Sequence, residues 1–165
     1  MSAFVIDSFA FSRLGEERHG VLPVAGLKRL TEDTANTSGE LAWTLRGGAD
    51  KYGHARLNLT VDGTVQLVCQ RCLTSFDYSI ASASSLILAR DEAEVDNIDA
   101  ALDDDEVDVI VGSSAFNVIE LIEDEALLAL PLAPKHEECP DQATLDALKA
   151  SAKPSPFAAL KNLKQ

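Results

Sequence analysis

Three cysteines and one histidine form the two motifs of this sequence that are best suited to chemistry. Cys69 and Cys72 are separated by two residues in the run CQRC, and His136 and Cys139 have the same spacing in the run HEEC. Two thiolates at this spacing can bind one tetrahedral Zn²⁺ when the backbone turns between them, and a histidine and a third cysteine can complete the ligand set. The residue types and spacing therefore predict a candidate structural zinc site of the Cys₃His type, which would join two distant parts of the chain.

The sequence leaves other interpretations of these four residues open. Without a metal, Cys69 would belong to a strand face, Cys72 to the adjoining turn, and His136 and Cys139 to a surface loop. A thioredoxin-like redox pair belongs at the start of a helix that follows a parallel strand, whereas this pair lies between runs typical of antiparallel strands. A cysteine nucleophile with His136 as its base would need a third orienting group and an oxyanion hole, for which the sequence has no motif.

Four carboxylates in the apolar run 117–130 are the next candidates: Glu120, Glu123, Asp124 and Glu125. Negative charge is favourable near a helix N-terminus, and Glu120 lies three residues after the predicted N-cap Asn117, as in a capping box. We therefore predict that Glu120 has a capping role and that the others lie on the solvated side of the helix. Because the sequence also has no glycine-rich phosphate loop, we predict no catalytic residue and no small-molecule substrate.

The net charge of −13 is unevenly distributed along the chain. Residues 1–90 hold nine basic and nine acidic side chains, residues 91–108 hold ten carboxylates and no basic residue, and residues 149–165 hold four lysines and no carboxylate. Close carboxylates repel one another, so the pattern predicts a solvated, extended acidic loop at 91–108. A Ca²⁺ site at residues 103–105 would need the alternating spacing and the glycine of an EF-hand loop, which are missing.

The elements that must position these residues are mainly strands. Apolar residues alternate with period two over 41–46, 57–61, 65–69 and 76–88, and Asp62-Gly63 is typical of a hairpin turn, so these runs predict a four-stranded meander. Residues 107–111 add a strand after the acidic loop, and residues 4–9 could add another. Helical spacing predicts one main helix over 117–130, ended by Pro131, and a shorter helix over 26–33.

The predicted fold class is therefore α+β, an antiparallel, meander-like sheet of about five or more strands packed with one main helix, with an acidic loop and a C-terminal docking tail. We expect one domain over residues 1–139, and a linker and basic, apolar tail over 140–165. With 165 residues, no apolar run long enough to cross a membrane and no signal-peptide pattern, we expect a cytoplasmic protein with no membrane partner.

Four motifs in this order resemble the bacterial YceD family, the large ribosomal RNA subunit accumulation proteins. They are CQRC (69–72) followed by Phe76, the acidic segment, the run NVIELIEDEALLALPLAPKHEEC (117–139), and the terminal PSPFAALKNLK (154–164). The resemblance implies a small cytoplasmic α+β protein, without known catalysis, that is needed for synthesis, processing or stability of 23S ribosomal RNA. The positions that carry the family pattern are Cys69, Arg71, Cys72, Glu123, Asp124, Glu125, Leu130, Pro131, His136, Cys139, Pro156, Phe157 and Leu160.

Contact with RNA or a partner would have to come from the neutral first half of the chain or from its tail, since these hold most of the basic residues. The candidate contact residues are Arg46, Arg56, Arg71, Phe157, Leu160, Lys161 and Lys164. Aromatic residues make up 5% of the chain, which is little for a base-stacking platform. We therefore expect a non-enzymatic factor that supports 23S ribosomal RNA and large-subunit assembly, with 23S RNA or its precursor as partner, reached through a basic ribosomal protein or a shaped RNA surface.

One alternative function is a protein-interaction module unconnected with RNA. In that case Phe157, Leu160 and Leu163 would dock in the groove of a partner. The tail could also fold back on its own sheet, because terminal apolar residues often cover their own core.

Overall fold

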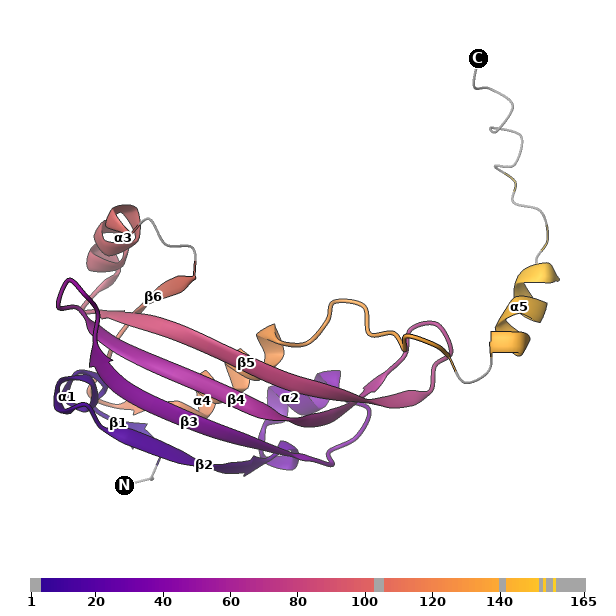
Figure 1. Cartoon of the computed structure of the whole chain (residues 1–165), viewed down its shortest axis with the longest axis horizontal. Coiled ribbons are helices and arrows are strands. Elements are labelled where there is room, and N and C mark those ends of the chain that lie inside the picture. Colours follow the sequence, from indigo (N-terminus) through magenta and orange to yellow (C-terminus); the bar gives the residue numbers. More distant parts are fainter. Residues whose placement is uncertain (1–3, 103–105, 140–141, 152, 154–155, 157–165) are drawn as a thin grey trace, which may run out of the picture.

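The computed structural model describes residues 4–102, 106–139, 142–151, 153 and 156. It confirms the α+β fold, with a five-stranded sheet in the order β2-β3-β4-β5-β6 (Figure 1). The strands of this sheet are β2 (Glu17–Pro23), β3 (Glu40–Ala49), β4 (Ala55–Val68), β5 (Ser75–Ala89) and β6 (Val107–Val111). The helices are α1 (Ser8–Leu14), the 3₁₀ turn η1 (Val24–Gly26), α2 (Lys28–Asp33), α3 (Glu92–Ala101), α4 (Val118–Leu128) and α5 (Gln142–Ala150).

The main core lies between one face of the sheet and the helices α1, α2 and α4. Along β4 the side chains of Leu57, Leu59 and Val61 are fully buried on this face, because successive strand residues point to opposite sides. Phe11 from α1, Leu30 from α2 and other apolar residues of the helices belong to the same cluster. Among the helices that the structure describes, none is long and apolar enough to cross a membrane.

The predicted hairpin at Asp62-Gly63 is wrong, because β4 runs without interruption through both residues. Gly63 pairs with Leu41 on β3 and with Ile80 on β5, so it lies in the middle of the sheet. A Cβ atom at this position would collide with the backbone carbonyl oxygen of Glu40. Gly63 is therefore explained by the close approach of a neighbouring strand and not by a turn.

The N-terminal residues do not add a strand to the main sheet, contrary to the expectation for residues 4–9. Only β1 (Val5–Ile6) is extended, and it pairs with β7 (Phe116–Asn117) in a separate two-stranded ladder. Asp7 then caps α1 by accepting a hydrogen bond from the Ala10 backbone at 3.0 Å. One edge of the sheet is instead formed by β2, which pairs antiparallel with β3 and was not expected from the sequence.

The acidic segment is not an extended loop over most of its length. Its first part forms α3, whose N-cap Asp91 accepts a hydrogen bond from the Glu94 backbone at 2.8 Å. Ile98 on this helix packs on Ile87 and Ala89 of β5, on the sheet face opposite the main core. The chain then returns as β6, which pairs in parallel with β5, so the sheet is only mostly antiparallel. Residues 103–105 lie outside the described part of the chain.

Helix α4 confirms the predicted main helix, with Asn117 as N-cap accepting a hydrogen bond from the Ile119 backbone at 3.1 Å. The expected solvent-facing position of Glu123 is wrong, because this residue is only 6% exposed. Its carboxylate accepts hydrogen bonds from the backbone N–H groups of Arg29 (2.7 Å) and Leu30 (3.1 Å), in the first turn of α2. Since the N-cap of α2 is Leu27, which has no capping side chain, Glu123 supplies the missing cap from another helix.

Candidate metal centre

The first half of the cysteine and histidine cluster is a tight turn between β4 and β5. The backbone N–H of Leu73 donates to the carbonyl of Cys69, and the N–H of Cys69 donates to the carbonyl of Thr74, both at 2.9 Å. Leu73 adopts a left-handed conformation with φ of 58°, which lets the chain reverse within residues 69–74. We call these six residues the knuckle.

The second half is the segment that follows α4. The Gln70 backbone N–H donates to the carbonyl of Pro134 at 2.8 Å, which places this segment along the knuckle. The guanidinium of Arg71 donates to the carbonyl oxygens of His136 and Glu137. These contacts bring together Cys72 and His136, which are 64 positions apart in the sequence.

The two halves bring Cys69, Cys72, His136 and Cys139 together, with their ligand atoms all within 4.8 Å of one another. The Sγ atoms of Cys69 and Cys139 are 3.9 Å apart, and Cys72 Sγ is 3.4 Å from His136 Nδ1. A tetrahedral zinc with bonds of about 2.3 Å to sulfur and about 2.05 Å to nitrogen requires about 3.8 Å between two sulfurs and about 3.6 Å between sulfur and nitrogen. Both distances therefore fit the edges of a zinc coordination tetrahedron.

The surroundings of the cluster favour metal ligation over packing alone. Cys69 and Cys139 are buried, and the His136 ring lies against Phe76 with 4.7 Å between ring centroids. Burial opposes ionisation of Cys69, but hydrogen bonds from Cys72, His136 and Arg71 outweigh it and lower the pKa of its thiol to about 5. Burial and the neighbouring sulfurs raise the pKa of Cys139. The lowered pKa favours the thiolate of Cys69, which is the form that binds metals.

The three arginines expected to contact RNA all make contacts within the protein. Arg46 donates to the Glu17 carboxylate at 2.6 Å, and Arg56 donates to the Ser85 hydroxyl at 2.6 Å. Arg71 holds the two halves of the cluster together through its hydrogen bonds to the carbonyls of His136 and Glu137. Its position between two predicted ligands could have indicated this role. The other candidate contacts, Phe157, Leu160, Lys161 and Lys164, lie outside the described residues.

Sequence reasoning missed one more buried polar group, the carboxylate of Glu123. Besides capping α2, this carboxylate accepts a hydrogen bond from the Arg29 guanidinium at 3.0 Å. The same guanidinium also donates to the carboxylate of Asp124 at 2.6 Å. No local sequence signal distinguishes Glu123 from its exposed neighbours, because its donors lie more than 90 positions away. The group is structural, since its buried oxygens are occupied by donors of α2.

Comparisons with known proteins agree in one family. A family model described as "Large ribosomal RNA subunit accumulation protein YceD" matches residues 57–164. A curated protein of that name from Haemophilus influenzae is 32% identical over 149 residues, which cover 84% of this chain and 82% of the relative. No solved structure matches the chain.

Proposed function

Because the chain belongs to the YceD family, we propose that it is a non-enzymatic cytoplasmic factor that supports synthesis, processing or stability of 23S ribosomal RNA and assembly of the large ribosomal subunit. The observation that carries this proposal is the match to a family model and to a relative whose descriptions both name large ribosomal RNA subunit accumulation. The family model matches residues 57–164, so the match includes the knuckle, the acidic segment and α4.

We propose further that the protein reaches the ribosomal precursor through a basic ribosomal protein. Direct binding to phosphates depends on arginines and lysines that are free to replace counterions. Arg46, Arg56 and Arg71 already donate to groups of this chain. The carboxylates of Glu92, Asp96 and Asp99 on α3, in contrast, are exposed, and such a surface attracts basic partners.

We also propose that the cluster binds a structural Zn²⁺. The support is the donor set, the two distances that match tetrahedral edges, and the low pKa of the Cys69 thiol. When bound, zinc would supply four coordination bonds that hold the knuckle against the segment after α4. All four positions in a tetrahedral site would then be taken by the protein, as in structural and not catalytic zinc sites.

The experiment that tests the function measures the ratio of 23S to 16S ribosomal RNA and the gradient profile of ribosomal particles in cells lacking this protein. We expect less 23S RNA and fewer large subunits than in the parent strain, with recovery when the wild-type chain is returned. An unchanged ratio, also in the cold and under stress, would contradict the proposal.

The partner is tested by neutralising α3. A chain with Glu92→Gln, Asp96→Asn and Asp99→Asn should co-sediment severalfold less with large-subunit precursors. A matched control removes the same charge elsewhere, through the exposed residues Glu40→Gln, Asp62→Asn and Glu138→Gln. Equal loss in both variants would show that overall charge, and not α3, controls the association.

A further inference from the structure

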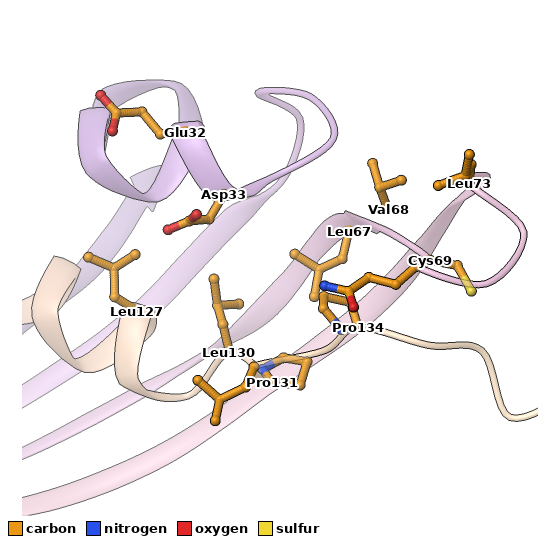
Figure 2. A pocket seen from close by; sticks show the side chains of 12 residues that line it. Glu32, Asp33, Leu67, Val68, Cys69, Leu73, Leu127, Leu130, Pro131 and Pro134 are labelled. Atoms are coloured by element: carbon orange, nitrogen blue, oxygen red, sulfur yellow. The ribbon is translucent and has the colours of Figure 1, made fainter. Parts of the chain in front are cut away.

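A cavity of about 500 Å³ opens beside the cluster, between the knuckle, the end of α2 and the end of α4 (Figure 2). Its lining is mainly apolar, and Figure 2 shows Leu127, Leu130 and Pro131 on one side and Val68 and Leu73 toward the other. We call this cavity the knuckle groove. Cys69 belongs to the cluster and also lines the groove, so the two sites are adjacent and have this residue in common.

The rim of the knuckle groove presents apolar side chains to solvent. Leu73 is 77% exposed and Leu132 is fully exposed, and both line the groove. Leu73 also has the left-handed backbone conformation, which is unfavourable for a residue with a side chain. Exposed apolar side chains gathered around a cavity are typical of an interaction surface, and strained backbone is concentrated at functional positions.

The rim is also acidic where α2 ends. Glu32 and Asp33 line the groove on the side of α2, and both are exposed (Figure 2). A segment that fits this surface must therefore combine several apolar side chains with basic residues beside them.

We propose that the knuckle groove binds the C-terminal segment 157–164 of the same chain. This segment has the required composition: Phe157, Leu160 and Leu163 recur every three residues, and Lys161 and Lys164 follow the last two. With no carboxylate between residues 149 and 165, it is also the most basic part of the chain. The apolar residues would enter the groove while the lysines face Glu32 and Asp33.

The path of the chain makes this binding possible. The stretch of chain that leads to residues 157–164 begins at the cluster, because its preceding residue is Cys139. The Sγ of Cys139 lies 3.9 Å from the Sγ of Cys69, which lines the groove. Helix α5 then spans about 13 Å at 1.5 Å per residue, and the remaining residues before Phe157 extend up to about 3.3 Å each. The tether is long enough to return to the groove, and short tethers give effective concentrations in the millimolar range.

A photo-crosslinking experiment on the full-length chain tests the proposal. The variant Phe157→p-benzoylphenylalanine keeps an aromatic side chain and reacts with nearby C–H bonds under light. We expect crosslinks within single molecules, mapped by mass spectrometry to the peptides 67–73 or 127–134. Crosslinks between two molecules would overturn the proposal in favour of a second copy, and an absence of crosslinks to these peptides would overturn it outright.

Three further variants separate binding from chance proximity. Leu73→Glu combined with Leu132→Glu changes only exposed side chains and should lower the crosslink yield at least fivefold. Charge reversal at Lys161 and Lys164 to glutamate should also lower it, and added reversal of Glu32 and Asp33 to lysine should restore it. A yield that none of these changes alters would refute binding in the groove. Because the assay uses purified protein, it is independent of the proposed role in ribosomal RNA.

Discussion

Substitution of Cys72 by serine is a mild perturbation of the fold and a severe one of the proposed zinc site. Cys72 is half-buried, and its Sγ lies 3.0 Å from Thr74 Oγ1 and 3.4 Å from His136 Nδ1. Serine has nearly the same shape but replaces a soft thiolate ligand by a weakly binding hydroxyl. The metal-free variant should therefore be about as stable as the metal-free wild type, and the difference should emerge only when zinc is added.

The size of that difference follows from linkage between binding and folding. A metal that binds only the folded chain adds about 4 kcal/mol to the free energy of unfolding when its free concentration is about 1,000 times Kd. Closing a loop of 64 residues costs about 3.7 kcal/mol. The sheet and the hydrogen bond between Gln70 and Pro134 already offset this cost in the metal-free folded protein, so it is not subtracted from the contribution of zinc. At about 2–4 °C per kcal/mol for this size, we expect zinc to raise the wild-type Tm by about 8–16 °C.

The assay compares thermal unfolding of the full chain with zinc and with a chelator, together with the metal content by mass spectrometry. We expect one zinc per wild-type chain and little in Cys72→Ser, whose Tm should be insensitive to the chelator. The control is His19→Ala, which removes an exposed histidine of β2 and should bind zinc like the wild type. A wild-type Tm that is the same with zinc and with chelator, or full zinc content in Cys72→Ser, would refute the site.

Three further predictions concern the fold. Glu123→Ala leaves the N–H groups of α2 without their acceptor and should lower the free energy of unfolding in urea by about 2–3 kcal/mol, whereas the exposed Asp124→Asn should cost less than about 1 kcal/mol. Gly63→Ala should cost about 1–3 kcal/mol because its methyl group meets the backbone of β3, while Gly48→Ala, with open space around it, should change stability little. Burial opposes ionisation of the Asp50 carboxyl, but hydrogen bonds from the His54 ring and from the backbone outweigh it and lower its pKa below 3.8. A depressed folded pKa gives stability that is present above pH 3.8 and lost as the pH falls through the folded value, so Asp50→Asn should make stability less dependent on acid pH.

These three predictions have clear contrary outcomes. Equal losses for Glu123→Ala and Asp124→Asn would mean that the buried carboxylate contributes no more than its exposed neighbour. A tolerated Gly63→Ala would mean that β3 and β4 can separate slightly without loss. Identical acid unfolding curves for the wild type and Asp50→Asn would mean that this carboxyl has the same pKa in the folded and unfolded chain.

The sheet illustrates how far a local turn signal can be trusted. Asp62-Gly63 has the composition of a hairpin turn, but the buried positions 57, 59, 61, 65 and 67 keep one alternating phase across it. A single strand preserves such a phase because its period is two throughout. The phase was therefore the better guide to β4, and the glycine reflects a contact with Glu40 that only the paired strands create.

Charge density was misleading for α3 for a different reason. Carboxylates repel one another, but those at the start of a helix interact favourably with its N-terminal N–H groups. The spacing of Val95, Ile98 and Leu102 gives the helix an apolar side that packs on the sheet beside Ile87. Burial on that side supplied the stabilisation that the charge pattern alone did not predict.

The candidate site was easier to predict than the fold around it. Ligand type and spacing are local properties, so the two motifs could be found without knowing any strand. The knuckle groove could not be found in this way, because its wall is assembled from α2, β4, the knuckle, the end of α4 and the segment after it. The left-handed Leu73 is equally hidden, since leucine has no preference for that conformation.

Cys69 connects the two proposals, that the cluster binds zinc and that the knuckle groove binds residues 157–164. Cys69 lies in both the cluster and the knuckle groove, and the turn that carries Leu73 is closed by hydrogen bonds of Cys69. Zinc that fixes this turn would also fix the shape of the groove, so metal and tail should favour each other's binding by the same factor. The crosslink yield from position 157 should then fall when a chelator is added. If the yield stays constant while zinc is lost, the groove holds its shape without the metal, and the two sites are energetically independent despite their common residue.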